Sequence, residues 1–174
     1  MVKQIAIVGP HGCGKTSLVQ RYTKKRFSES YCGTVISDTV VDSMNNIIWD
    51  TPGNTRFKPD MDKIIEKSKG IVLCFSPDVT DSFNKALSMI GKYDRPVVMA
   101  ATKTDIQPLY IRDEWSSEAR NRNVKIISTS SFTGKGISQV FREIFDLVDD
   151  EEISLGSFSE QLGSCINYGV SYVT

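Results

Sequence analysis

The stretch from Gly9 to Thr16 constrains the fold of this chain more than any other. It reads GPHGCGKT and matches the phosphate-loop pattern G-x-x-x-x-G-K-[ST]. Phosphate oxygens need several donors that converge on one point, and glycines let the backbone curl so that its N–H groups face inward. An apolar run at residues 2–8 precedes the motif and a helical pattern follows it. The sequence therefore predicts a phosphate-binding turn between a buried strand and a helix, whose N-terminal dipole favours anions.

Each polar residue of this turn has an expected role. Lys15 is expected to bring a cation to the terminal phosphates, and the Thr16 hydroxyl to ligate Mg²⁺. The other residues expected to line the phosphates are His11, Gly12, Cys13, Gly14 and Ser17. The alternative interpretation is a glycine turn followed by a lysine on the surface.

Apolar runs and helical stripes alternate along the rest of the chain. Continuous apolar runs indicate buried strands at residues 71–75 and 97–101. A last strand is indicated by Val124, Ile126 and Ile127. Val40 and Val41, then residues 47–49, indicate two strands around the turn-prone pair Asn45 and Asn46. Helical stripes run from Leu18 to Tyr22, from Phe83 to Ile90 and from Ile137 to Val148. This order predicts an α/β fold with a mostly parallel central sheet flanked by helices on both faces. Ligands of such sheets bind at the carboxyl ends of the strands.

Length and composition indicate one domain with a short extension. The chain has 174 residues, enough for a single core. We expect residues 1–149 to form the domain. Residues 150–174 begin in an acidic patch and continue into a Ser/Gly-containing tail, so we expect them to be an extension outside the core, partly ordered or flexible. Lys plus Arg (21) equals Asp plus Glu (21), which gives no overall field for nucleic acid.

The sequence gives no sign of export or of a membrane anchor. The four cysteines show no metal-ligand spacing, which favours free thiols in the cytosol. No apolar run approaches the length of about 18 residues that spans a bilayer. Val2 excludes N-myristoylation, and no prenyl-acceptor motif precedes Thr174. We therefore expect a cytoplasmic monomer that reaches endomembranes, if at all, through partners.

Three further motifs follow the phosphate loop. They are WDTPGN at 49–54, TKTD at 102–105 and TSSF at 129–132. In this order they resemble W-D-T-A-G-Q, N-K-x-D and T-S-A-K of the Ras superfamily of small GTPases, over residues 1–149. The resemblance implies a P-loop GTPase fold, the G domain, that binds GTP or GDP with Mg²⁺.

Two of these motifs are expected to read the base. A carboxylate at Asp105 would accept both the N1–H and the exocyclic amine of guanine, whereas adenine offers neither donor there. The resemblance implies that the Lys103 stem lies over the base and that the Ser131 backbone N–H reaches guanine O6. Thr102 stands where the family usually has Asn, and Phe132 stands where it usually has Lys. Ser130 is the remaining residue of the two motifs that is expected to line the base. Taken alone, Asp105 is also a common turn residue.

The resemblance also implies a nucleotide-dependent switch. Asp50 would hold Mg²⁺ through a water, and the Gly53 N–H would reach the γ-phosphate. Residues 27–35 resemble the Rab branch's F/Y-x-E-x-Y-x-x-T-I stretch. By that resemblance Thr34 ligates Mg²⁺ and donates to the γ-phosphate, while Phe27 packs against guanine and Tyr31 closes over the phosphates. Effectors, exchange factors and GTPase-activating proteins would then bind through 27–38 and 51–65. The alternative is a merely flexible loop with Phe27 in the core.

The residues around the expected reaction centre predict slow hydrolysis. Catalysis is expected from Lys15, Gly53 and Asn54, where the family has Gln to orient the attacking water. Asn54 is one methylene shorter, about 1.5 Å. Pro52 replaces Ala and stiffens the approach, and His11 would crowd an incoming arginine finger. The sequence thus predicts a Rab-like GTP/GDP switch, in vesicle traffic by analogy, with weakened intrinsic hydrolysis.

Two other functions compete with this one. The first is a GTP-locked binding module or decoy for GTPase partners, favoured by the same departures at Asn54, Pro52 and His11. The second is a small nucleoside-phosphate kinase, which shares the phosphate loop. Such kinases carry an arginine-rich lid, whereas Arg112, Arg120 and Arg122 indicate a solvated helix face. The TKTD motif at a strand end also argues against a kinase.

Overall fold

The structure is a computed structural model. It describes residues 2–24, 37–53, 58–79, 81–106 and 113–166, with 58–60, 113 and 152–166 described as backbone only. One six-stranded sheet organises this part of the chain, in the order β2-β3-β1-β4-β5-β6. Its strands are β1 (Gln4–Val8), β2 (Asp38–Val41), β3 (Ile47–Asp50), β4 (Gly70–Phe75), β5 (Val97–Ala101) and β6 (Lys125–Ser128).

All neighbouring strands are parallel except β2, which pairs antiparallel with β3. The β2–β3 connection turns at Asn45, whose φ of 63° is the left-handed conformation that Asn tolerates. In the register of β1, Ile7 lies opposite Asp50 of β3 and Val72 of β4. The carboxyl ends of these strands therefore lie at the same edge of the sheet.

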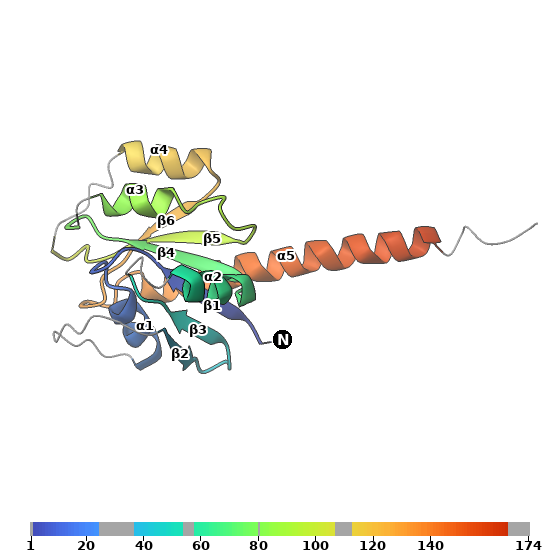
Figure 1. The fold of residues 1–174 in the computed structure, drawn as a ribbon, viewed down its shortest axis with the longest axis horizontal. Helices are drawn as coiled ribbons and strands as arrows, with labels where there is room; N and C mark the ends of the chain where they lie inside the picture. The colour runs from blue at the N-terminus through green and yellow to red at the C-terminus, as the bar shows by residue number, and fades with distance from the viewer. Residues whose placement is uncertain (1, 25–36, 54–57, 80, 107–112, 167–174) are drawn as a thin grey trace, which may run out of the picture.

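Helices cover both faces of the sheet, as predicted (Figure 1). They are α1 (Lys15–Lys24), α2 (Lys58–Lys67), α3 (Ser82–Leu87), α4 (Asp113–Asn121) and α5 (Ile137–Ile166). Side chains of β1 alternate between the two resulting cores, because successive residues of a strand point to opposite faces. Ile5 and Ile7 pack with α1 and α5, whereas Ala6 and Val8 pack with α2, α3 and α4.

Two helices differ from the predicted stripes. The helix expected to reach Ile90 ends at Leu87, because Met89 and Ile90 donate to carbonyls only three residues back and Gly91 then adopts a φ of 77°. The stripe expected to end at Val148 belongs to a helix that continues to Ile166. Val148 is the last buried residue of α5 among those whose side chains are described. Beyond it, Figure 1 shows α5 running away from the sheet.

None of the helices in the described ranges combines the length and the apolar character that crossing a membrane requires.

Candidate functional site

The turn from Gly9 to Gly14 connects β1 to α1 and passes directly over the end of β4. A Cβ on Gly9 would lie 2.2 Å from the Cys74 carbonyl oxygen, so no residue with a side chain fits there. Cys13 is buried beneath the turn, while His11 is exposed on its outer side. The glycines thus let the backbone curl tightly against the sheet edge.

The Lys15 ammonium lies inside this turn. Its Nζ donates to the carbonyl oxygens of Gly9 at 2.9 Å and Pro10 at 3.1 Å, and the residue is 6% exposed. Lys15 is therefore not the surface lysine of an ordinary glycine turn. Among the described residues, the acceptors of this buried ammonium are carbonyl oxygens, and it can turn from them to an anionic ligand that offers stronger acceptors.

Thr16 and Asp50 meet at the start of α1 and the end of β3. The Thr16 hydroxyl donates to Asp50 Oδ2 at 2.6 Å, and Asp50 is 4% exposed. Burial raises the pKa of Asp50 above its usual value, although the Thr16 hydrogen bond and the Lys15 charge act in the opposite direction. Among the described residues, Asp50 Oδ1 has no hydrogen-bond partner. The Thr16 hydroxyl and a buried carboxylate oxygen without a donor fit a hard cation such as Mg²⁺.

The segment after β3 lies against the phosphate turn. Thr51 is buried, and its hydroxyl donates to the Ile7 carbonyl at 2.7 Å. A Cβ on Gly53 would lie 2.5 Å from His11 Cα and 2.8 Å from Lys15 Nζ. The backbone of Gly53 therefore approaches both the turn and its lysine more closely than any other residue type allows.

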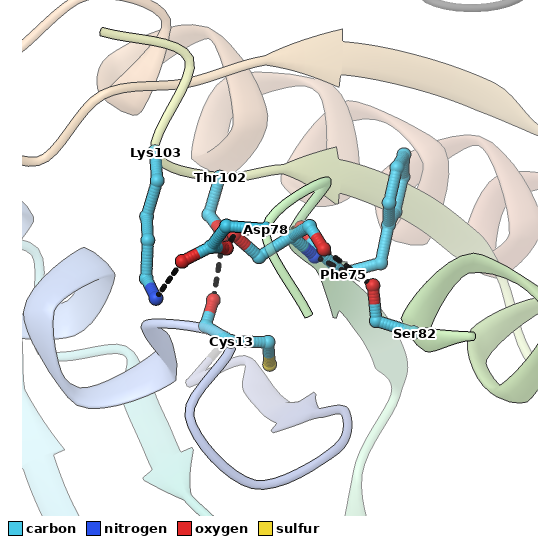
Figure 2. Close-up of polar contacts among 7 residues, drawn as sticks. Cys13, Phe75, Asp78, Ser82, Thr102 and Lys103 are labelled. Carbon is cyan, nitrogen blue, oxygen red and sulfur yellow. Dashed lines mark hydrogen bonds and ion pairs between the residues drawn. The ribbon is translucent and has the colours of Figure 1, made fainter. Parts of the chain in front are cut away.

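Thr102 joins the loop after β5 to the phosphate turn. Its buried hydroxyl lies 2.6 Å from the Cys13 carbonyl oxygen and 3.0 Å from that of Phe75 (Figure 2). A single hydroxyl hydrogen serves one acceptor best, and the shorter distance favours Cys13. Thr102 thus ties together the two loops that were predicted to bind phosphate and base.

The loops after β5 and β6 are also bonded to each other. Both the backbone N–H and the hydroxyl of Thr104 donate to the Thr129 carbonyl oxygen, each at 3.1 Å. Lys103, which precedes Thr104, adopts a φ of 56°, a backbone conformation that a non-glycine residue rarely holds. Asp105 is exposed at the same loop. The two loops therefore form one unit at the carboxyl edge of the sheet.

The loop after β6 is closed by its own hydrogen bonds. Ser130 is buried, donates from its N–H to Lys135 and accepts at its carbonyl from Gly134. Among the described residues, no backbone hydrogen bond is donated by Ser131. Phe132 follows with 57% of its surface exposed. This arrangement fixes the backbone of 129–132 while keeping the Ser131 N–H available for a ligand.

The structure brings most of the predicted site together at one edge of the sheet. Phe27, Tyr31, Thr34 and Asn54 lie outside the described residues, so their predicted roles stay predictions. Sequence reasoning missed Asp78, which forms an ion pair with Lys103 at 2.8 Å. No local pattern links residues 25 positions apart, and only the topology of β4 and β5 shows that they meet.

Comparison with known proteins decides the family. The model of the Ras family matches residues 4–150. This chain belongs to the Ras family. Ras-related protein Rab-18 of Lymnaea stagnalis is 26% identical over 83% of this chain and 79% of its own. RabC of Dictyostelium discoideum is 27% identical, with 79% of each chain covered, and Rab-12 of Mus musculus is 31% identical over 60% of this chain and 48% of its own.

Family membership identifies the general activity. The chain is a Rab-like small GTPase, a switch that binds GTP and has GTPase activity. Members of the family bind guanine nucleotide with Mg²⁺ and act with regulators and effectors. The P-loop GTPase fold expected from the motifs is confirmed, with its mostly parallel sheet between two layers of helices.

Proposed function

We propose that this Ras-family protein is a GTP/GDP switch in vesicle traffic whose intrinsic hydrolysis is slow. The assignment to vesicle traffic rests on the Rab-named relatives. We further propose a cytoplasmic monomer with a domain at 1–149, which reaches endomembranes through partners that bind 27–38 and 51–65.

The observation that carries the proposal is the hydrogen bond between the Thr16 hydroxyl and the buried Asp50, close to the buried ammonium of Lys15. The Thr16 hydroxyl and Asp50 would hold Mg²⁺, with Thr34 as a further ligand, and Lys15 would bind the terminal phosphates. When bound, the ion neutralises charge on the phosphates. The backbone N–H groups of Gly12 to Thr16, with Ser17 behind them and His11 at the rim, would complete the phosphate cradle.

Guanine would be read at the unit formed by the loops after β5 and β6. In the proposed site Asp105 accepts from the base edge, Ser131 donates to O6, and the Lys103 stem covers one face. Thr102 and Ser130 hold the two loops in place. Phe132, together with Phe27 and Tyr31 from the 27–35 stretch, would close the apolar edge of the nucleotide site.

The proposal of slow hydrolysis rests on where Gly53 lies. The Gly53 backbone is packed against His11 and against Lys15, which is proposed to bind the terminal phosphates. An Asn that follows Gly53 reaches about 1.5 Å less far than the Gln of the family. A water that is held even 1 Å or so out of place reacts far more slowly.

A titration tests the binding part of the proposal. Fluorescent GDP, GTP and ATP are titrated with Mg²⁺ onto the full chain and onto Asp105→Asn. We expect strong preference for guanine in the wild type and loss of that preference in the variant. Preference for ATP, or full guanine selectivity in Asp105→Asn, would overturn the proposed base site.

Single-turnover hydrolysis tests the slow rate. We expect Asn54→Gln to raise the rate, with Asn121→Gln, an exposed residue at the end of α4, as the matched control. Absence of a gain removes Asn54 as the cause. The departures at Asn54, Pro52 and His11 also favour a GTP-locked binding module, which predicts that the purified wild type retains GTP and that neither variant turns it over.

A further inference from the structure

The ammonium of Lys103 is held by a residue from a different loop. Lys103 Nζ donates to Asp78 Oδ2 at 2.8 Å, and Asp78 lies in the loop that follows β4 (Figure 2). Both side chains are about one-third exposed, at 32% and 33%. The pair therefore lies at the rim of the proposed base site.

Asp78 is itself fixed in place, which distinguishes this pair from an incidental surface contact. Its other oxygen, Oδ1, accepts from the Ser76 hydroxyl. The loop is closed by Val79, whose N–H donates to the Ser76 carbonyl at 3.0 Å, and by Ser82, whose hydroxyl donates to the same carbonyl at 2.5 Å. Both carboxylate oxygens are thus used, and Ser76 and Val79 on either side of Asp78 are hydrogen-bonded.

We infer that Asp78 is a positioning residue for guanine nucleotide, which it serves by holding the Lys103 stem across the face of the base. This inference rests on the proposed role of Lys103 at the base. The left-handed backbone of Lys103 is held by the hydrogen bonds of Thr102 and Thr104 on either side of it, and Asp78 fixes the other end of the side chain. A lysine stem is otherwise freely rotatable, so anchoring it in advance reduces the entropy lost when the base binds.

The charge state of Asp78 supports this role. Partial burial alone would raise the pKa of Asp78, but the hydrogen bonds from Lys103 and Ser76 and the Lys103 charge outweigh it, so the pKa is lowered. The carboxylate is therefore ionised at neutral pH and acts as a permanent anchor for the ammonium.

The base is common to GDP and GTP, so the effect of Asp78 must be the same on both. Dissociation of fluorescent GDP and GTP is measured from the Mg²⁺-loaded full chain. We expect Asp78→Asn to raise both dissociation rates about two- to fivefold, which is the effect of losing a partly exposed ion pair. The ratio of the GDP rate to the GTP rate should not change. Asp78→Glu keeps the charge and should recover part of the loss. Glu143→Gln breaks the 2.6 Å pair with Lys125 at the start of β6 and should change neither rate.

A double-mutant cycle separates positioning from a structural role. In a Lys103→Met background, Asp78→Asn should have no further effect, because Asp78 acts only through the ammonium. The same acceleration in both backgrounds, or no acceleration in the single variant, would overturn the inference. A wild-type chain that does not retain guanine nucleotide would instead overturn the proposed site itself, so the two failures are distinguishable.

Discussion

The backbone of Gly53 packs directly against the phosphate turn. Gly53→Ala would place a Cβ 2.5 Å from His11 Cα, and backbone cannot move aside as a side-chain end can. We expect the segment 51–53 to shift away from Lys15, so that the variant loses about tenfold of its preference for GTP over GDP, roughly the value of one hydrogen bond. The ratio of the two dissociation constants measures this.

The matched control for this variant is Gly91→Ala. Gly91 has no neighbour within 4 Å of an added Cβ, although its φ of 77° is strained for alanine. Gly91→Ala should therefore lose some stability and leave the nucleotide ratio unchanged. A similar change of the ratio in both variants would show that the Gly53 effect is one of general stability.

Thr102 carries the second prediction at the residue scale. Thr102→Val keeps the shape but leaves the Cys13 carbonyl without its 2.6 Å partner in a buried place. The free energy of unfolding should fall by about 1–3 kcal/mol, the usual cost of an unsatisfied buried polar group. Urea unfolding measures it, with Thr39→Val on the exposed edge strand β2 as control. Equal losses in the two variants would contradict the importance of this bond.

The residues of the site were predictable where a motif names them. Gly9 to Thr16 and the end of β3 follow from local sequence, and the structure brings Thr16 within 2.6 Å of Asp50, while their role as ligands stays a prediction. Asp78 was not predictable, because its partner Lys103 is distant in sequence and the pairing depends on how neighbouring strands end.

At the scale of elements, a hydrogen bond from Tyr93 links α2 to the segment before β5. The Tyr93 hydroxyl donates to Asp62 Oδ1 at 2.6 Å, and α2 overlaps the segment 51–65 proposed to bind partners. Tyr93→Phe removes the bond and should lower the free energy of unfolding by about 0.5–1.5 kcal/mol. Faster hydrogen exchange of the α2 amides should accompany it, because the helix loses this anchor.

The same bond predicts a dependence on pH. Partial burial and the bond to Asp62 raise the pKa of Tyr93 from 10.0 to about 12. The folded chain then binds the phenolic proton more tightly than the unfolded chain, so the stabilisation is present in full below pH 10.0 and is lost as pH rises to about 12. The gap in unfolding free energy between wild type and Tyr93→Phe should close over this range. A difference in unfolding free energy that stays constant over this range would contradict the raised pKa of Tyr93 as the cause.

The elements themselves were predictable in proportion to how simple their pattern is. β4 and β5 are buried on both faces, and their continuous apolar runs gave their positions to within a residue. α2 was not predicted, because its apolar residues Met61, Ile64 and Ile65 are few in a polar stretch. The predicted end of α3 was wrong, because the partly buried Ile90 continues the apolar stripe through a turn that is not α-helical.

At the scale of the whole molecule, the site and the C-terminal part of α5 lie at opposite edges of the sheet. α5 begins after β6 at the edge that carries the site, packs against β4 and β5, and so runs back to the opposite edge. There, a Cβ on Gly70, at the start of β4, would lie 2.9 Å from the Val148 side chain. The part of α5 beyond Val148 therefore leaves the molecule on the side away from the candidate site.

This arrangement predicts that the extension is dispensable for nucleotide binding. A chain that ends at Glu151 should release GDP within about twofold of the wild-type rate and unfold with nearly unchanged free energy, as for surface changes in general. A chain that ends at Asp146 also loses the buried Val148 and the ion pair of Asp149 with Lys3. It should lose about 1.5–3 kcal/mol, the value of one buried valine. If the chain that ends at Glu151 releases GDP much faster than the wild type, the domain boundary proposed at residue 149 is wrong. Residues after 151 would then contribute to the fold that holds the site.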